Sequence, residues 1–479
     1  MKLTKPTDTP PFPANVRSVL ATFEERKATL DQNKQQMKKV STTVVLLIVF
    51  GVASASASDQ IPGAPQKKRT ALINGTLHPV SGPSIEDGTL IFDNGKIVEM
   101  GRRMKPPKGA VVIDLKGKHV YPGLIESCSN LGLTEISSVR ATIDISESGL
   151  LNPNISAHVS VNPDSELIPV TRANGVLIAL SAPSGGLVSG KASVMQLDGW
   201  TYEDMTLKSD CAMVIQWPRS APALEHGPVP PVHESQQERD RIRSKALKDL
   251  RELFEHTRTY IKAREANPSE QAFDSRLNAM IPVIEGRIPL LIAADRASQI
   301  QGAVAFGVEQ GVKVILLGGH DAEMCAELLR RYDVPVIIDA IYKVPRRTHE
   351  DYDSAYSLPE RLRQAGIKFC ISTTGRLETW NTRNLPYHAA TAAAYGLPQD
   401  EALRSITQYP AEILGIADRV GTLEVGKDAT IFVSDGDPLE TETQVTAAWI
   451  QGRKVDLTSR HTQLYDKYQI KYRQLKDQR

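Results

Sequence analysis

Two β-rich regions at opposite ends of the chain constrain its fold more than any other feature. Residues 70–120 hold short apolar runs with turn signals, including the Asn94-Gly95 pair that is typical of a tight hairpin. Residues 418–458 repeat this pattern, with a turn, an apolar strand and a second hairpin. The simplest arrangement is one small composite β-sandwich built from both ends of the chain, with the residues between them inserted as a second domain.

The inserted residues 121–417 alternate short apolar runs with helical segments, as a parallel α/β fold requires. A long charged helix is expected over about 236–266, because Leu250 and Phe254 lie on one apolar stripe. The number and length of the segments predict a distorted (β/α)8 barrel, a TIM barrel. A doubly wound open sheet is the alternative, and the split β-region argues against it. The candidate strands are 175–180, 212–216, 289–294, 312–317, 335–339 and 367–372.

The overall composition is that of an ordinary globular protein. Of 479 residues, 24% are charged and 41% are hydrophobic. The formal net charge of +1 gives no reason to expect a nucleic-acid partner. Residues 459–479 are polar and charged and predict a C-terminal surface helix. Large barrels are often oligomeric, so a homo-oligomer is among the expected states.

Residues 37–57 have the order of a secretory signal peptide. A basic run that begins at Met37 precedes an apolar run over 41–53 and then small residues in an A-x-A pattern. A polar extension, residues 1–36, precedes this segment, and a Pro- and Lys-rich linker, residues 58–69, follows it. We therefore expect translation from Met37 and an exported protein, periplasmic or extracellular. The alternative is an uncleaved signal that anchors the chain in the membrane, although the apolar run is short for a membrane span.

The cysteines are few and widely spaced. An oxidising compartment permits disulfides, and four cysteines allow three full pairings. Their spacing shows no C-x-x-C metal pattern, so buried thiols on or near barrel strands are the favoured interpretation. The four residues are Cys128, Cys211, Cys325 and Cys370.

The stretch Val120–Leu133 reads V-Y-P-G-L-I-E-S-C-S-N-L-G-L. It resembles the first barrel strand of the amidohydrolase superfamily, in which an apolar P-G-L-I-D run is followed by His-x-His. Cys128 and Asn130 stand at the positions of the two metal-binding histidines, and an asparagine amide is a poor zinc ligand. The tail G-x-L-x-x-G-K-D-A at 421–429 resembles another family signature. The resemblance covers about residues 70–455 and is closest to the imidazolonepropionase-like branch.

Other strands resemble the segments that carry later ligands in the family. The run around 290–300 looks like H-A-H-R-A-x-x-I, with Ala293 and Asp295 at the two histidine positions. Asp295 is therefore a candidate for binding a cation or ordering a water, or it simply pairs with Arg296. A Pro-Arg-Arg loop at 345–347 is expected either to meet an anionic substrate group or to be a solvated basic loop.

Two further positions complete the family pattern. The run V-I-L-L-G-G-H-D-A-E resembles I-x-H-G-x-E-A and places Gly318 at a histidine position. His320, two residues later, is a candidate displaced ligand, although a cap of the following helix is favoured. Thr373 or Thr374 stands where the family has the acid–base aspartate, and threonine cannot act as that base. Residues 181–191 are rich in small side chains and predict a plain βα turn rather than an anion cradle.

The resemblance implies metal-dependent hydrolysis of non-peptide C–N bonds, in cyclic amides or acyl-amino compounds, with zinc or another divalent ion. Every recognisable ligand position is replaced, however, so no metal is expected unless the family activity survives. The alternative is an exported, metal-free pseudoenzyme that binds a small ligand or a protein partner at the barrel mouth. A third hypothesis is a different hydrolytic site made of Cys128, Asp295 and His320.

Overall fold

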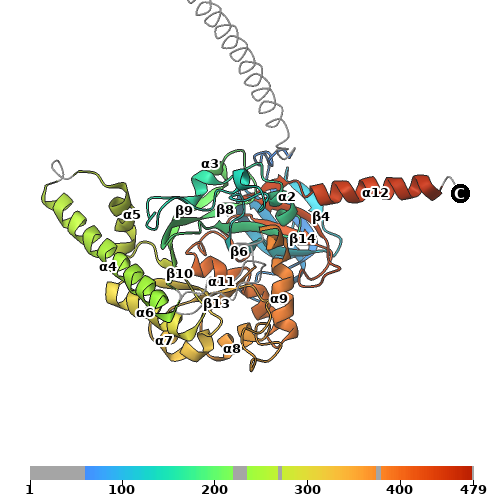
Figure 1. The fold of residues 1–479 in the computed structure, drawn as a ribbon. Coiled ribbons are helices and arrows are strands. Elements are labelled where there is room, and N and C mark those ends of the chain that lie inside the picture. Colours follow the sequence, from blue (N-terminus) through green and yellow to red (C-terminus); the bar gives the residue numbers. More distant parts are fainter. Residues whose placement is uncertain (1–59, 219–234, 268–271, 374–378, 477–479) are drawn as a thin grey trace, which may run out of the picture. The chain divides into compact units, whose positions relative to one another are not determined.

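The structure is a computed structural model that describes residues 60–218, 235–267, 272–373 and 379–476. Figure 1 follows the chain to its C-terminal helix, α12 (Arg460–Lys476). The predicted signal peptide at 37–57 lies outside the described residues, as does Thr374. Within the described ranges, no helix is both long and apolar enough to cross a membrane.

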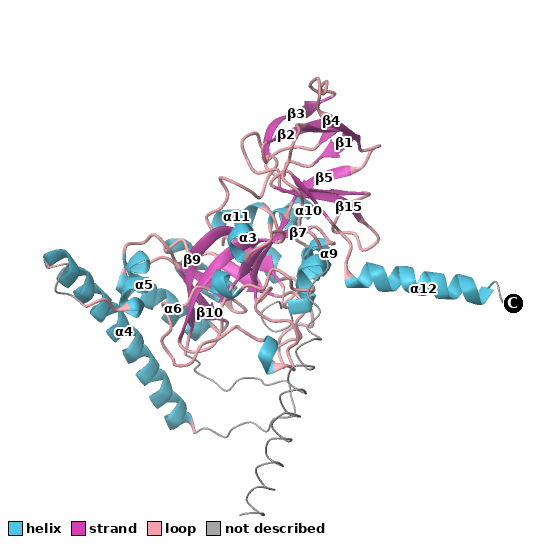
Figure 2. Cartoon of the chain, turned by 90° about the horizontal axis from the view of Figure 1, so that it is seen from above, coloured by secondary structure: helices cyan, strands magenta, loops and turns pink. Residues whose placement is uncertain are grey.

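Strands from both ends of the chain form one eight-stranded sheet, and Figure 2 shows β1, β2, β3, β4, β5 and β15 together. The strands are β1 (Thr70–Leu77), β2 (Ile85–Asp93), β3 (Lys96–Arg102), β4 (Val111–Asp114), β5 (His119–Pro122), β14 (Ile431–Ser434), β15 (Val445–Ile450) and β16 (Arg453–Val455). Their order is β16-β15-β14-β5-β1-β2-β3, with β4 paired to β1. The rings of Phe92 on β2 and Trp449 on β15 meet edge to face with centroids 5.8 Å apart, although three strands separate β2 from β15. The sheet therefore folds over a shared apolar core.

The residues between these two halves form a second eight-stranded sheet, a nearly closed barrel in the order β13-β12-β11-β10-β9-β8-β7-β6. Its strands are β6 (Leu124–Ser129), β7 (Val176–Ser181), β8 (Val188–Gln196), β9 (Thr206–Gln216), β10 (Leu290–Ala294), β11 (Val314–Gly318), β12 (Val336–Asp339) and β13 (Phe369–Ser372). All neighbouring pairs are parallel except the two that involve β8. The prediction of a distorted TIM barrel is confirmed, and its distortion is the reversed strand.

The reversed strand also corrects the interpretation of residues 181–191. They connect β7 to β8 as part of a β-hairpin, with Ser181 paired to Ser193, and do not form a βα turn. Gly185 and Gly186 have φ values of 92° and 65°, which let the chain reverse there. The strand β8 reads V-S-G-K-A-S-V-M-Q, and its small and polar residues conceal the apolar run by which the other strands are recognised.

Helices cover the barrel between its strands. The long helix α4 has the predicted bounds and buries Leu250 and Phe254. The α-helices are α2 (Leu167–Arg172), α3 (Tyr202–Met205), α4 (Gln236–Ala266), α5 (Ser275–Ile284), α6 (Ala297–Gln310), α7 (Ala326–Arg331), α8 (Leu358–Gln364), α9 (Leu385–Ala394), α10 (Gln399–Arg404) and α11 (Gln408–Ile413). Short 3-10 helices are η2 (Arg140–Thr142), η3 (Ala157–Ser160), η4 (Ala322–Cys325) and η5 (Thr379–Asn384). The four cysteines are buried thiols, as predicted, and none forms a disulfide.

Candidate functional site at the barrel mouth

The interior of the barrel is apolar along most of its length, because every strand from β6 to β13 contributes side chains to one buried apolar cluster. Such a packed interior is usual for barrels, which keep their chemistry at the carboxyl ends of the strands. Polar side chains appear at that end here, which we call the barrel mouth. The mouth residues considered below are Asn130, Gln216, Asp295, His320, Asp321, Arg346, Arg347, Glu350 and Thr373.

Glu126 joins the first and last strands of the barrel. Its side chain is fully buried and accepts hydrogen bonds from the backbone N–H groups of Cys128 at 3.0 Å and Thr373 at 3.1 Å. The Ser372 hydroxyl donates to the same carboxyl group. Burial raises the pKa of Glu126 to about 7, although these hydrogen bonds oppose the rise. Glu126 occupies the aspartate position of the family's P-G-L-I-D run and closes the seam between β6 and β13.

Three of the expected ligand positions offer no useful set of donor atoms. Cys128 is buried in the apolar interior cluster, and Ala293 packs against that cluster. Asn130 is also buried, and its Nδ2 donates to the carbonyl oxygen of Ala182 at 2.6 Å. The Oδ1 of Asn130 has no hydrogen-bond partner within the described part of the chain. A thiol, an amide and a methyl group therefore replace three imidazoles.

Asp295 follows β10 and pairs with the loop after β12. Its Oδ2 lies 2.9 Å from Nη1 of Arg346, whereas the neighbouring Arg296 serves as the N-cap of α6. Gly318 has a φ of +107°, and a Cβ atom there would lie 2.5 Å from Oδ1 of Asp295. A histidine at position 318 would therefore require Asp295 to move and would strain the backbone.

His320, Asp321 and Glu350 form a second charged group, which is built around Arg347. The Arg347 guanidinium donates to both carboxylate oxygens of Asp321, at 2.8 and 2.6 Å, and to Oε1 of Glu350 at 2.9 Å. Nε2 of His320 lies 3.0 Å from the same glutamate oxygen. The predicted cap role of His320 is wrong, because Asp321 is the N-cap residue of the next 3-10 helix and His320 pairs with Glu350.

The ligand atoms of His320, Asp321 and Glu350 all lie within 4.8 Å of one another, so their donor types and spacing alone would suit a metal ion. The position is nevertheless taken by Arg347, whose positive charge would repel a divalent ion. Burial raises the pKa of Glu350, but hydrogen bonds from His320 and from backbone N–H groups outweigh it and bring the pKa down to about 2. The carboxylate is thus satisfied by protein donors. This group of residues does not fit a metal ion.

The Pro-Arg-Arg loop has neither of its two expected roles. Arg346 pairs with Asp295, and Arg347 pairs with Asp321 and Glu350. The third hypothesis, a hydrolytic site of Cys128, Asp295 and His320, also finds no support in the contacts of these side chains. Asp295 and His320 are each paired with a different residue, and the thiol belongs to the apolar interior.

Three buried polar atoms at the mouth lack a partner among the described residues. They are Oδ1 of Asn130 on the β6 side, Nε2 of Gln216 at the end of β9, and Oδ1 of Asp295 after β10. Gln216 lies two residues beyond Val214, which faces the barrel interior, so the two side chains share one face of the strand. Buried polar atoms normally find partners. Two acceptors and one donor are therefore unpaired within the described part of the chain.

Sequence reasoning missed several residues of the mouth. Glu126 could have been found as a carboxylate within an apolar strand run, and Glu350 as an acid three residues after Arg347. The Nδ1 atom of His388 accepts a hydrogen bond from the backbone N–H of Ile341 at 3.1 Å, and burial lowers the pKa of this histidine to about 4. His388 is thus held neutral beneath the mouth, a role that depends on contacts between distant segments.

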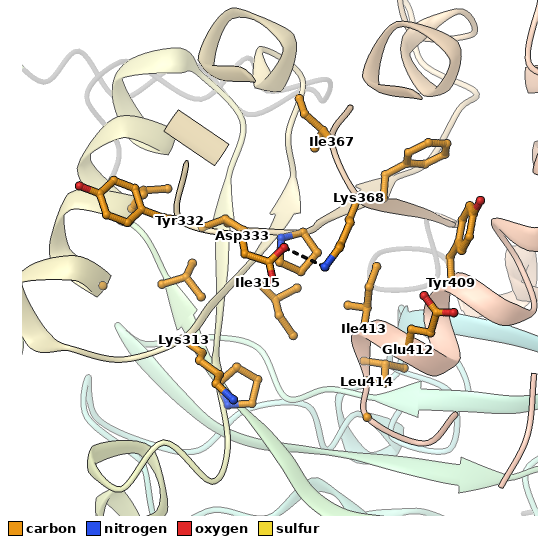
Figure 3. Close-up of a pocket in the computed structure, with 18 of the residues that line it drawn as sticks. Lys313, Ile315, Tyr332, Asp333, Ile367, Lys368, Tyr409, Glu412, Ile413 and Leu414 are labelled. Carbon is orange, nitrogen blue, oxygen red and sulfur yellow. Dashed lines mark ion pairs between the residues drawn. The ribbon is translucent and has the colours of Figure 1, made fainter. Parts of the chain in front are cut away.

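A cavity of about 940 Å³ lies at the opposite, amino end of the barrel, among the starts of β10 to β13 and the end of α11 (Figure 3). Its polar groups are largely paired within the protein. Lys368 forms an ion pair with Asp333 at 2.8 Å, and Lys208 donates to the carbonyl oxygens of Leu414 and Gly415. Because barrels keep their catalytic residues at the other end, this cavity is not the equivalent of an amidohydrolase active site.

Comparisons with known proteins agree with this architecture. A family model described as the Amidohydrolase family matches residues 296–461. Amidohydrolase tasK of Hapsidospora irregularis is 23% identical over 81% of this chain and 43% of that protein. Imidazolonepropionase of Brucella anthropi is 27% identical over 31% of this chain and 35% of that protein. The chain thus spans less than half the length of these curated relatives.

The solved structures give the same fold. The crystal structure of an amidohydrolase from Thermotoga maritima matches 81% of this chain and 99% of that protein, with a TM-score of 0.71 and 24% identity. The match to the family model, the relatives and the strand and tail motifs concur. The chain is similar in sequence to the amidohydrolase superfamily over residues 296–461 and has an amidohydrolase-like fold.

Proposed function

We propose that this chain is a metal-free amidohydrolase homologue that binds a small, neutral, polar molecule at the barrel mouth without hydrolysing it. The observation that carries the proposal is the position of Arg347. Its guanidinium binds Asp321 and Glu350, the two carboxylates that a metal ion in this part of the mouth would need. Because a cationic side chain already balances these acids, the mouth lacks the Lewis acid and the activated water of family hydrolysis.

The unpartnered atoms of the mouth suggest the chemical class of the ligand. Oδ1 of Asn130 and Oδ1 of Asp295 accept hydrogen bonds, and Nε2 of Gln216 donates one. A compound with N–H groups and a carbonyl group, such as a cyclic amide, would satisfy all three. Charged ligands are less suitable, because Asp295 is already balanced by Arg346. An analogue that lacks one of the matching groups would leave a buried polar group of the site unpaired and would therefore bind more weakly.

A binding experiment tests this proposal. The full chain is titrated calorimetrically with hydantoin, a cyclic amide, and with N-acetylalanine as an acyl-amino compound. We expect hydantoin to bind and Asn130→Ala and Gln216→Ala each to weaken binding at least tenfold. Gln364→Ala is the matched control, because Gln364 is an exposed glutamine at the end of α8 and should leave affinity unchanged. Absence of binding, or equal affinities for all variants, would contradict the proposal.

Metal-dependent hydrolysis of a C–N bond is the second candidate function. The clustering of His320, Asp321 and Glu350 favours it, because their ligand atoms lie close together. It requires that zinc, iron or manganese displaces Arg347 from the carboxylates. Adding these ions to the purified chain and following hydrolysis of the same two compounds separates the candidates. Turnover that depends on the metal and disappears in Glu350→Ala would support hydrolysis over the binding proposal.

A further inference from the structure

Helix α12 stands apart from the rest of the described chain. Only its start is fixed: Nδ1 of His461 lies 2.8 Å from Nη1 of Arg383, and the Thr462 hydroxyl donates to the carbonyl oxygen of Ser459 at 2.9 Å. None of the 17 residues of α12 is buried. Both ribbon views show the helix extending away from the two sheets (Figures 1 and 2).

An unsupported helix of this length needs a partner. Isolated helices shorter than about 12–15 residues are marginal in water, and even longer ones gain most of their stability from packing an apolar face. The sequence of α12 contains β-branched and aromatic residues rather than a run of alanines, so its intrinsic helix propensity is moderate. The helix is therefore expected to be most stable when one of its faces is covered.

One face of α12 is suited to being covered. At 100° per residue, five large side chains fall within a sector of about 100° along the helix. They are between 40% and 64% exposed, and no described segment packs over them. This apolar face consists of Leu464, Tyr465, Tyr468, Tyr472 and Leu475.

Cationic side chains border the apolar face on both sides. The same helical geometry places Arg460, Lys467 and Lys471 along one edge and Lys476 along the other, with Arg473 further round the helix. The single acidic residue of the helix, Asp466, lies on the face opposite the apolar one. Tyrosine carries a polar hydroxyl on an apolar ring, and lysine and arginine reach outward on flexible apolar stems. This combination is typical of helices that lie in the headgroup region of a membrane.

We propose that α12 docks on the surface of a bilayer that contains anionic phospholipids. The tyrosines and leucines of the apolar face enter the boundary between headgroups and acyl chains, and the flanking cations contact the phosphates. The axis of the helix lies in the plane of the membrane, because the helix is too polar to span it. Pairing with a second copy of the chain is disfavoured, because the cations that flank the apolar face in each copy would gather around one narrow apolar seam.

Vesicle binding tests this proposal. The full chain is centrifuged with vesicles of phosphatidylcholine alone, and with vesicles that contain one third phosphatidylglycerol. We expect at least tenfold stronger binding to the anionic vesicles at low salt, and loss of most of this difference in 0.5 M NaCl. Removal of residues 460–479 should abolish the preference for anionic vesicles while leaving the urea unfolding of the remaining chain unchanged, because α12 buries nothing.

Matched double substitutions separate the apolar face from the polar one. Tyr468→Ser with Tyr472→Ser should weaken binding to anionic vesicles at least tenfold, and Lys467→Glu with Lys471→Glu should remove the preference for them. Gln463→Ser with Gln474→Ser changes two side chains outside the apolar face of the same helix and should leave binding unchanged. Equal effects of the tyrosine and glutamine variants would overturn the proposal.

A local probe excludes a contribution from the apolar run at 41–53, which every variant retains. Leu475→Cys is labelled with an environment-sensitive nitrobenzoxadiazole dye, since the four natural cysteines are buried. A blue shift with anionic vesicles supports docking of α12 itself. An unshifted dye overturns the proposal. A shift without vesicles that grows with protein concentration also overturns it, and would identify a second copy of the chain as the partner.

Discussion

Two networks of ion pairs in this molecule use the same chemistry for different purposes. The first network lies in the sheet built from both ends of the chain, which we call the frame. There Asp428, in the G-x-L-x-x-G-K-D-A tail, lies 2.7 Å from Arg419 and 2.5 Å from Lys96, and so fastens the C-terminal half of the sheet to the N-terminal half. In the mouth, Arg346 and Arg347 bind acids at the ends of the barrel strands. The frame network is centred on Asp428, a residue that matches the family's tail pattern. The mouth network instead pairs its acids with the loop after β12, at the end of the barrel where the family resemblance places metal ligands.

The largest effect should come from the frame. Replacing Asp428 with alanine leaves Arg419 and Lys96 without their buried acceptor, whose side chain is 1% exposed. Breaking such a pair costs about 3–5 kcal/mol when both partners are buried, and about 3 kcal/mol here because Lys96 is half exposed. Urea unfolding measures the loss. Asp418→Ala, at an exposed site nearby, should change stability by less than about 0.5 kcal/mol. A similar loss of unfolding free energy in both variants would show that the ion pairs of Asp428 do not stabilise the frame.

The seam at Glu126 should give an effect of similar size, which depends on pH. The pKa of this carboxyl group is raised by burial to about 7 in the folded chain from its ordinary value of 4.5, so the folded state holds its proton more tightly. The contribution to stability is full below about pH 4.5 and is lost as pH rises through 7, a change of about 3 kcal/mol. Unfolding of the wild type should therefore become easier between pH 5 and 8. Glu126→Gln should show a flatter pH profile, and an unchanged profile would assign the effect elsewhere.

Restoring a family histidine tests how far the mouth has adapted. Gly318→His should lower the free energy of unfolding by about 2 kcal/mol, because of its positive φ and the contact with Asp295. It should gain no affinity for zinc. Gly82→His is the control, since a Cβ atom there meets nothing within 4 Å. A stable Gly318→His variant that binds zinc would show that the mouth is still organised as a metal site.

The smallest effect should come from removing the positive charge of Arg347. Arg347→Met frees Asp321 and Glu350, and zinc should then raise the melting temperature by a few degrees, whereas the wild type should not respond. Adding Glu350→Ala to this variant should cancel the response. An equal response of the wild type would mean that Arg347 does not exclude the metal.

Local signals predicted the frame well. The Asn94-Gly95 turn, the apolar runs of the parallel strands and the stripe of α4 each depend on neighbouring residues, and the structure places strands or helices there. Strand β8 was missed because its Gly190 and Lys191 interrupt the apolar pattern. The mouth was predicted only as a set of replaced ligands. The pairs of Arg346 with Asp295 and of Arg347 with Asp321 join residues 51 and 26 positions apart in the sequence, and no local pattern reveals such partners.

Metal content tests the central claim most directly. The full chain is purified without chelators and without a metal-binding tag, and its zinc, iron and manganese are determined by elemental analysis alongside a check that it is folded. The occupied position of Arg347 predicts a folded protein with less than about a tenth of an equivalent of any of these metals. One or two equivalents, bound with His320, Asp321 and Glu350 as ligands, would contradict the account and restore the hydrolase.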